Sequence, residues 1–318
     1  MKKANGLKKL LTHRQQNHLK KQSKKRNITM SLQNKIDFAL IFNVLNANPN
    51  GDPLNGNRPR TDYDGFGEIT DVCLKRKIRD RLQEAGESIF VQSDEKKTDG
   101  MTSLRNRAES DEVGLGKEVF NSKKTAPDQA AKLCCEKWLD VRTFGQVFAF
   151  KGTGTEGVSI PIRGPVTIQS AFSIEPVSIT STQITKSVSG EGDGTKKSSD
   201  TMGMKHRVDK ATYVAFGAMT PQLAEKTGFS DEDAEKIKAV LVKLFEGDAS
   251  SARPEGSMGI SHLVWWKHDS KSGQYSSAKV HQTLRAHIEQ GLPLETSALN
   301  DSLVSALQGL EPEVIEGF

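Results

Sequence analysis

The segment between residues 36 and 81 constrains the fold of this chain more than any other. An apolar run at residues 36–45 predicts a buried strand. Residues 46–60 form a loop rich in Asn, Gly, Pro and Asp, the residue types that fix or permit turns. A loop of this length without a core of its own is usually functional or disordered. A basic helix is expected at residues 70–81.

The predicted helix has two different faces. An apolar stripe recurs at helical spacing, and a group of cations lies on the far side. The stripe consists of Leu74, Ile78, Leu82 and Ala85, and the cations are Lys75, Arg76 and Arg79. A strand, a polar loop and a cationic helix face together predict a platform for a phosphate backbone.

The charge of the chain is distributed unevenly. The 318 residues carry a formal charge of +5, but residues 1–29 contain ten Lys or Arg and no acidic residue. Residues 30–318 therefore have a net charge of −5. Like-charge blocks stay unfolded, so we expect residues 1–29 to be a disordered or non-native extension. A nucleic-acid arm and a targeting peptide are the alternatives, although no apolar stretch typical of a secretory signal follows.

Three cysteines, Cys73, Cys134 and Cys135, form no C-x-x-C pair, which fits neither a disulfide framework nor a zinc signature. A reducing cytosol suits them best, so we predict a cytoplasmic protein without a metal or other cofactor. No apolar run approaches the roughly 18 residues of a membrane span.

The order of predicted elements indicates an α+β fold. After the first strand and helix, strands are expected at residues 140–150, 164–174, 179–188, 213–219 and 259–268, and helices from Pro127, at 230–246 and at 279–290. Ser230 and Asp233 match a helix cap, and Gly247 closes that helix. Without insertions, the order is strand, helix, strand, strand, helix, strand, as in ferredoxin-like or RRM-like sheets. Such sheets bind single-stranded RNA on their open face.

Two segments interrupt this order. Residues 96–124 are polar and irregular and are interpreted as a loop or insertion, within an inserted region at about 90–139. Strand-like residues 179–188 lead into the Gly-rich residues 189–194, which predicts either a protruding β-hairpin or a disordered surface loop. The acidic C-terminal tail, residues 292–318, includes one weak helix near residues 298–308.

Catalytic signatures are scarce. The seven histidines form no H-x-H or H-E-x-x-H pair, and no nucleophile elbow or Walker loop is present. The best catalytic candidates are Asp52, Asp62, Asp64 and Asp71. Carboxylates near a phosphate could hold Mg²⁺, but Asp beside Gly or Pro more often forms a turn. We therefore predict that the protein is not an enzyme.

The candidate binding residues are cations and a few apolar side chains. On the predicted strand 140–150, a guanidinium could meet phosphate while a ring stacks under a base, although a core ring and a salt-bridged Arg would look the same. Methionines could wedge between bases or cap the hairpin. The candidates are Arg58, Arg60, Arg142, Phe144, Arg163, Met202, Met204, Lys205, His206 and Arg207.

Several sequence blocks, in one order, resemble the backbone subunit of type I-C CRISPR Cascade complexes (the "Cas seven" family, Csd-two subtype). The blocks are residues 48–53 (NPNGDP), 56–60 (GNRPR), 70–79 (TDVCLKRKIR), 140–145 (DVRTFG), 163–166 (RGPV), 202–206 (MGMKH) and 266–271 (WKHDSK). The resemblance spans about residues 36–287. The family usually begins near Met30, which fits the interpretation of residues 1–29 as an extension.

The resemblance implies a modified RRM palm over residues 30–291 with a β-hairpin thumb at about residues 174–207. Copies would stack head to tail along a CRISPR RNA, and each thumb would flip out a base, leaving short segments free to pair with target DNA. It assigns guide contacts to Lys75, Arg76, Arg79, Arg142, Arg163 and residues 205–207.

The implied partners are the guide RNA, target DNA through the heteroduplex, other copies of the chain, and the RNA-processing end subunit, large subunit and small subunits of Cascade. A helicase-nuclease recruited by the complex completes the set. The alternative is a metal-dependent, RNA-cleaving backbone subunit that uses a loop aspartate, among Asp52, Asp62 and Asp64.

Overall fold

The computed structural model describes residues 30–150, 158–186 and 202–318. Ser31–Phe318 form one compact unit, separate from Met1–Met30. The expected extension at residues 1–29, the Gly-rich residues 151–157 and the tip of the predicted hairpin at 187–201 lie outside the described residues.

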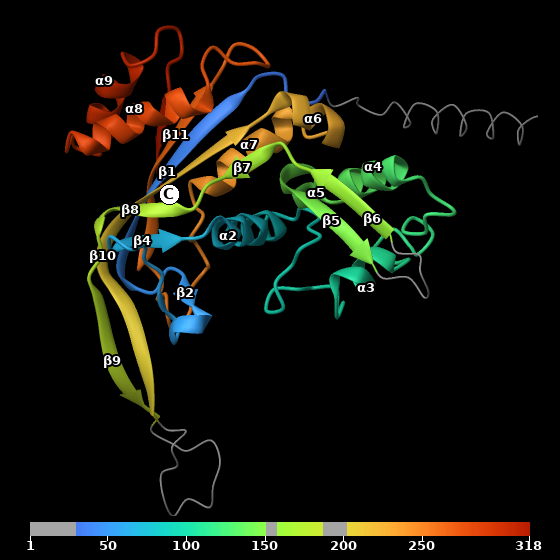
Figure 1. Ribbon diagram of the computed structural model, residues 1–318, viewed down its shortest axis with the longest axis horizontal. Coiled ribbons are helices and arrows are strands. Elements are labelled where there is room, and N and C mark those ends of the chain that lie inside the picture. Colours follow the sequence, from blue (N-terminus) through green and yellow to red (C-terminus); the bar gives the residue numbers. More distant parts are fainter. Residues whose placement is uncertain (1–29, 151–157, 187–201) are drawn as a thin grey trace, which may run out of the picture. The chain divides into compact units, whose positions relative to one another are not determined.

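An eight-stranded antiparallel sheet forms the centre of this unit (Figure 1). Its main path runs in the order β12-β11-β1-β10-β8-β4, and β7 and β9 also pair with β10. The strands are β1 (Ile36–Ala47), β4 (Phe66–Ile69), β7 (Val166–Ile168), β8 (Ala171–Pro176), β9 (Ile179–Thr185), β10 (Met202–Met219), β11 (Met258–Lys267) and β12 (Glu313–Glu316). The mixed α+β class is confirmed. Along the chain, β1, α2, β8, β10, α7 and β11 follow the predicted strand-helix-strand-strand-helix-strand order.

One face of the sheet packs against α2 (Asp71–Glu84) and α7 (Asp231–Leu241). The predicted apolar stripe of α2 is confirmed for Leu74, Ile78 and Leu82, which are buried in this core. Ala85, the fourth predicted member, is exposed and follows the end of the helix. The predicted cap of α7 is also confirmed: Ser230 and Asp233 form a reciprocal capping box. The helix ends earlier than expected, and turns follow it at residues 242–247.

The opposite face of the sheet is covered by α8 (Ser277–Glu289) and α9 (Thr296–Val304), which lie together beside β11 and β1 (Figure 1). Val280, Leu284, Leu299 and Leu303 pack on the outer side chains of β1, β10 and β11. The residues after 291 thus contribute α9 and the edge strand β12 to the fold. Most of the face that an RRM leaves open is buried here.

The inserted region has its own core, built from α3 (Leu104–Glu109), α4 (Pro127–Lys137), α5 (Leu139–Phe144) and the hairpin of β5 (Gly145–Phe150) and β6 (Val158–Arg163). The rings of Phe90, Phe120, Trp138 and Phe148 meet in its centre. The helix expected from Pro127 is confirmed as α4. The polar segment 96–124 is irregular except for α3.

The strand predicted at residues 140–150 is wrong in its first half. Residues 139–144 form α5, and only Gly145–Phe150 form a strand. The cause is tertiary: Asp140 is fully buried, and its carboxylate accepts hydrogen bonds from the amides of Phe90 (2.7 Å) and Val91 (3.0 Å). Gly145 then ends the helix with a φ of 80°, a conformation that glycine adopts readily.

The strand expected at residues 164–174 is divided into β7 and β8. Between them, the amide of Gln169 donates a hydrogen bond to the Phe216 carbonyl.

Within the described residues, none of the helices has the length and apolar character needed to cross a membrane.

A buried polar cluster at the start of β1 makes stability depend on pH. His281 of α8 is buried and its Nε2 lies 3.1 Å from the Gly217 carbonyl oxygen and 3.6 Å from Asp37 Oδ1. Burial lowers the pKa of His281 and that of His262. Because the unfolded chain then takes up protons first, the free energy of unfolding should decrease as the pH falls below the unfolded value of about 6.5.

We predict that His281→Gln flattens part of this dependence. Chemical denaturation at several pH values between 8 and 5 would measure it. His262→Gln should remove a separate portion, since the two imidazoles do not share partners. An equal pH dependence in His281→Gln and in the unchanged protein would contradict the assignment.

Candidate nucleic-acid interface

The Asn- and Gly-rich loop is an ordered structure fixed to the start of α2. Asn50 Oδ1 accepts hydrogen bonds from the amide (3.0 Å) and hydroxyl (3.1 Å) of Thr70, which caps α2. Asn48 Nδ2 donates to the Asn57 carbonyl (2.7 Å). Gly51 leaves room for the Asn57 side chain, since a Cβ there would lie 2.0 Å from Asn57 Oδ1. The loop contains the short strands β2 (Gly51–Asp52) and β3 (Arg58–Pro59) and the 3₁₀ turn η1 (Pro53–Asn55).

This loop presents both of its predicted arginines. Arg58 is exposed and has no ion-pair partner among the described residues. Arg60 is partly exposed, and its guanidinium lies 3.4 Å from Asp52 Oδ1. Leu54 and Tyr63, which the sequence did not single out, are fully exposed at neighbouring turns.

The loop aspartates act within their own turns. Asp52 Oδ1 accepts a hydrogen bond from the Leu54 amide (3.2 Å). Asp62 Oδ1 accepts from the amides of Asp64 (3.0 Å) and Phe66 (2.8 Å). These are the contacts of turn-forming carboxylates. The part of the chain that the structure describes contains no group of three or more potential metal-ligating residues.

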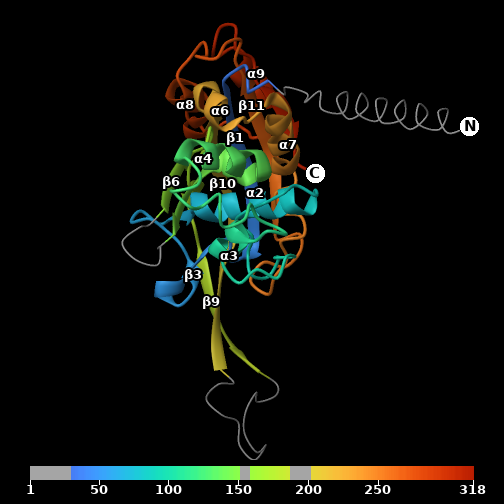
Figure 2. The ribbon, with the colours of Figure 1, turned by 90° about the vertical axis from the view of Figure 1, so that its right-hand side faces the viewer.

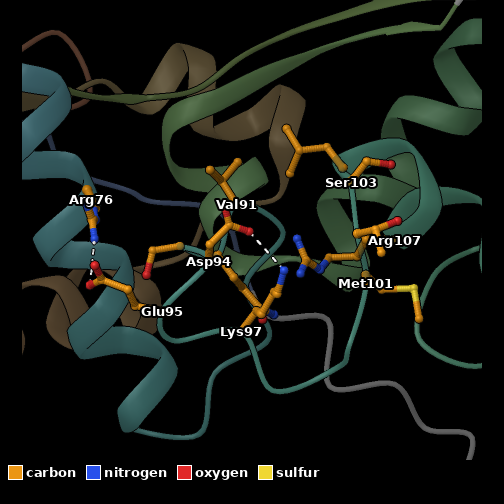
Figure 3. Close-up of a pocket in the computed structure, with 12 residues that line it drawn as sticks. Arg76, Val91, Asp94, Glu95, Lys97, Met101, Ser103 and Arg107 are labelled. Carbon is orange, nitrogen blue, oxygen red and sulfur yellow. Dashed lines mark hydrogen bonds and ion pairs between the residues drawn. The ribbon is translucent and has the colours of Figure 1, made fainter. Parts of the chain in front are cut away.

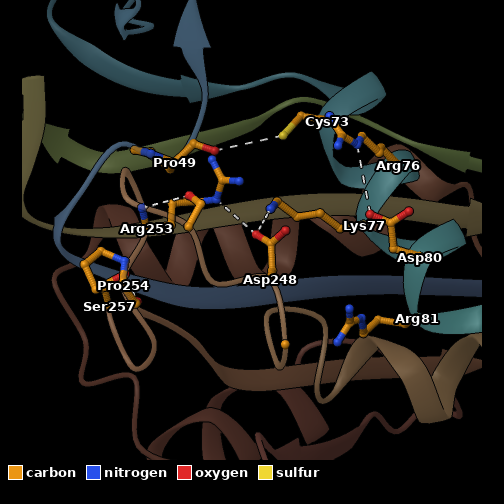
Figure 4. Close-up of polar contacts among 12 residues, drawn as sticks. Pro49, Cys73, Arg76, Lys77, Asp80, Arg81, Asp248, Arg253, Pro254 and Ser257 are labelled. Atoms are coloured by element: carbon orange, nitrogen blue, oxygen red, sulfur yellow. Dashed lines mark hydrogen bonds and ion pairs between the residues drawn. The ribbon is translucent and has the colours of Figure 1, made fainter. Parts of the chain in front are cut away.

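The α2 cations divide between surface and interior. Lys75 pairs with Asp71 (2.8 Å), and Arg76, 56% exposed, lies 3.6 Å from Glu95 at the edge of a cavity of about 580 Å³ (Figure 3). Lys77 is buried instead and pairs with Asp248 (Figure 4).

Arg253 also binds Asp248 (3.0 Å), so this network ties α2 to the loop before β11. Burial lowers the pKa of Lys77 even though Asp248 opposes the shift. Lys77 therefore belongs to the core, although its charge alone would have suggested phosphate binding.

Arg79 and Phe144, both predicted binding residues, contact each other inside the protein. The Arg79 side chain is 13% exposed, and its Nε donates to Asp140 Oδ2 (3.0 Å). Its guanidinium carbon lies 5.0 Å from the centroid of the Phe144 ring. The pair thus fixes α5 to α2, and its ring and cation have internal partners.

Arg142 likewise has an internal partner. Its Nε and Nη2 each lie 2.8 Å from one carboxylate oxygen of Asp233, and the side chain is 18% exposed. Asp233 is the residue that caps the first turn of α7, so Arg142 joins α5 to the start of that helix. Arg163, by contrast, is exposed at the end of β6, opposite Gly145.

The predicted hairpin is confirmed for the described residues, where β9 pairs with the first part of β10 from Met202↔Thr185 to Val208↔Ile179. Both views show it extending away from the rest of the sheet (Figures 1 and 2). Its tip is outside the described residues.

The register of the hairpin places its functional candidates on two different faces, because side chains of paired strands alternate. Met202 and Met204, 60% and 54% exposed, share one face with His206. Lys205 and Arg207 share the other. The apparent cationic trio is therefore split.

His206 is buried and its Nδ1 lies 2.8 Å from Ser181 Oγ, which links the two strands. Lys205 is exposed and has no ion-pair partner within the described ranges, whereas Arg207 lies 3.5 Å from Asp209 Oδ1.

The hairpin, the loop and α2 meet at the base of the hairpin. β3 packs beside β10, and the Val177 amide donates to the Gly65 carbonyl (2.9 Å) in the turn that follows β3. Thr70 joins the same loop to α2. The structure thus assembles Arg58, Arg60, Lys75 and the hairpin cations on connected elements. Lys210, which the sequence analysis did not single out, is also exposed on β10, but the strand register places it on the sheet face that carries Val214 and Phe216.

The fold and its exposed cations define an α+β protein with a projecting, two-faced hairpin and a separate, internally paired set of arginines. The sequence model of the CRISPR-associated protein Cas7 family matches residues 34–302, and the chain belongs to this family. A protein described as CRISPR-associated protein Cas7 from Haloferax volcanii is 28% identical over 259 residues, which cover 77% of this chain and 73% of that protein.

Two solved structures are similar to this chain. One, described as a CRISPR RNA-guided surveillance complex, pre-nicking, has a TM-score of 0.44 at 15% identity and covers 82% of this chain and 89% of its own. The other, a CRISPR RNA-guided surveillance complex, has a TM-score of 0.41 at 14% identity, with 80% and 84% covered.

We predict that Arg142→Ala destabilises the protein by about 3 kcal/mol, because it leaves the buried Asp233 carboxylate without its partner. Denaturant unfolding would measure the loss. In Arg142→Ala/Asp233→Asn, the cost should be smaller than the sum of the two single changes, since both partners of one pair are removed. Unchanged stability in Arg142→Ala would show that the ion pair contributes little.

Proposed function

We propose that this chain is a non-catalytic, CRISPR RNA-binding backbone subunit of a type I-C Cascade surveillance complex. Family membership supports the CRISPR setting, and the sequence blocks quoted above support the subtype. The observation that carries the RNA-binding role is the two-faced hairpin: cations on one side and exposed methionines on the other, projecting from a rigid sheet.

The roles that we propose for the cations and the methionines of the hairpin follow from their chemistry. Lys205 and Arg207 would contact phosphates, because cations grip the backbone without reading sequence. Met202 and Met204 would pack against bases or displace one from the stack, as apolar wedges do in other nucleic-acid complexes. A guide carrier must accept any spacer, so a grip on phosphate and sugar suits it, while Watson–Crick pairing reads the target.

Arg58, Arg60, Lys75, Arg76 and Arg163 extend this proposed surface, since each retains some exposure. We assign a different role to Arg79, Arg142, Phe144 and His206. Their internal partners make them supports that hold the insertion and the hairpin in place.

Assembly would supply the affinity that a single copy lacks. Residues 30–318 have a net charge of −5, so one copy offers a few local cationic contacts rather than a basic field. Several copies arranged head to tail on one RNA would add their contacts, and a heterologous interface whose rotation does not close forms an open filament. The proposed partners are therefore the guide RNA, target DNA paired with it, further copies, and the other Cascade subunits.

We predict that Lys205→Ala weakens binding of unrelated single-stranded RNAs by a similar factor. It should also reduce the slope of log affinity against log salt by about 0.7, the effect of one lost phosphate contact. Fluorescence anisotropy over a salt series would test this. Lys132→Ala, a change to an exposed lysine on α4, is the matched control and should leave the slope unchanged. A loss confined to one RNA sequence would argue against a backbone grip.

The competing proposal, cleavage of RNA by a loop aspartate, predicts a regular ladder of products with Mg²⁺. We expect assembled wild-type complex to yield no ladder, because Asp52 and Asp62 serve their own turns. Gel analysis of labelled RNA would decide. A Mg²⁺-dependent ladder that disappears in Asp62→Ala, with RNA binding intact, would establish the enzyme instead.

A further inference from the structure

A groove remains open on the sheet face that α8 and α9 otherwise cover. It lies where β8 and β10 pass beyond α8 and has a volume of about 380 Å³. Its walls include Phe66, Phe172, Ile174, Val214, Phe216 and Arg285. Phe172 is 41% exposed. The groove thus offers an aromatic ring to a ligand at a place where the fold leaves it uncovered.

Polar side chains also line the groove beside its aromatic rings. The guanidinium carbon of Arg285 lies 4.3 Å from the centroid of the Phe216 ring, and its Nη2 donates to Gln169 Oε1 (3.3 Å). These two contacts hold an exposed cation beside the apolar wall. Glu289 at the rim could accept hydrogen bonds from an exocyclic amino group. A planar, hydrogen-bonding and anionic ligand fits this set.

A second cation stands on the same face. Val214 and Phe216 of β10 line the groove. Alternate residues of a strand share a face, so Lys210 lies on the same face as these two residues. It is about 13 Å along β10 from Val214. It is exposed and has no ion-pair partner in the described part of the chain. Cations thus flank the aromatic groove, as expected for a site that takes a base between two phosphates.

We propose that this groove binds one unpaired nucleobase of single-stranded RNA by stacking on Phe172, with Arg285 and Lys210 contacting the flanking phosphates. The inference rests on the proposed RNA-binding function and adds a site apart from the hairpin and α2. The described part of the chain's own hairpin does not fill the groove. β10 runs without a break from Met204 to Val214, so their Cα atoms lie about 33 Å apart.

The test uses the full chain and single-stranded RNA that contains 4-thiouridine. Ultraviolet crosslinking followed by mass spectrometry of peptides should find RNA attached within β8. Phe172→Leu, which keeps an apolar side chain but removes the ring, should weaken RNA binding roughly 5- to 100-fold. Phe172→Tyr should retain binding, since it keeps the stacking surface. Val147→Ala, at an exposed apolar position on β5, is the control and should bind as the unchanged protein does.

Three results would overturn the proposal in distinguishable ways. Normal RNA affinity in Phe172→Leu, with crosslinks confined to the hairpin and α2, would remove the groove site and leave the proposed function standing. Normal RNA affinity combined with loss of copies from the assembled particle would show that the groove holds a neighbouring chain. Absence of RNA from particles assembled with the unchanged protein would refute both the groove and the proposed function.

Discussion

The continuity of β10 is the constraint on which the rest of this structure depends. One strand, Met202–Met219, pairs with β9 at its start and with β1, β7 and β8 further along. The hairpin is therefore an extension of a central sheet strand rather than a loop attached to it. Because β1 and β10 pair over almost the whole length of β1, the sheet holds the direction of the hairpin. A rigid projection of this kind can position side chains at a fixed distance from the sheet.

Ion pairs also fix elements of the fold to one another. Arg79 and Arg142 each meet a buried carboxylate, Asp140 and Asp233, and Lys77 meets the partly buried Asp248. Each carboxylate comes from a different part of the chain than its cation. Buried ion pairs contribute modestly to net stability, but breaking one leaves an uncompensated charge. These pairs therefore specify how α2, α5 and α7 fit together. Several of the exposed cations lie on the hairpin, the β2–β3 loop and the end of β6, where a polyanion could reach them.

Periodicity predicted the central fold because burial there follows simple patterns. The apolar run that becomes β1 and most of the stripe of α2 were both found, and the Ser230–Asp233 cap was confirmed by its geometry. The alternating pattern at residues 140–144 predicted a strand, but these residues form a helix. The run is short, so its preference for a strand is too weak to outweigh the tertiary contacts around it. Asp140 lies in a buried nest of amides contributed by residues 50 positions earlier, and no local pattern shows this.

The same limit applies to the site. The residue types in the loop and hairpin identified exposed candidates such as Arg58 and Lys205, but charge alone could not separate Lys205 from Arg142, whose partner lies 91 positions away. The strand register, once known, also divided the trio at residues 205–207 between two faces. The sequence analysis did not identify Phe172 and Arg285 as site residues. They line one groove only because of where α8 lies on the sheet, and no local pattern predicts that position.

The central claim, that this chain forms a backbone on guide RNA, is tested most directly by the intact mass of the assembled particle. Residues 30–318 would be produced together with the candidate partner subunits and a CRISPR array, and the purified particle weighed by native mass spectrometry. The account predicts one discrete particle that contains several copies of this chain and a single processed RNA. A folded monomer free of RNA would contradict it.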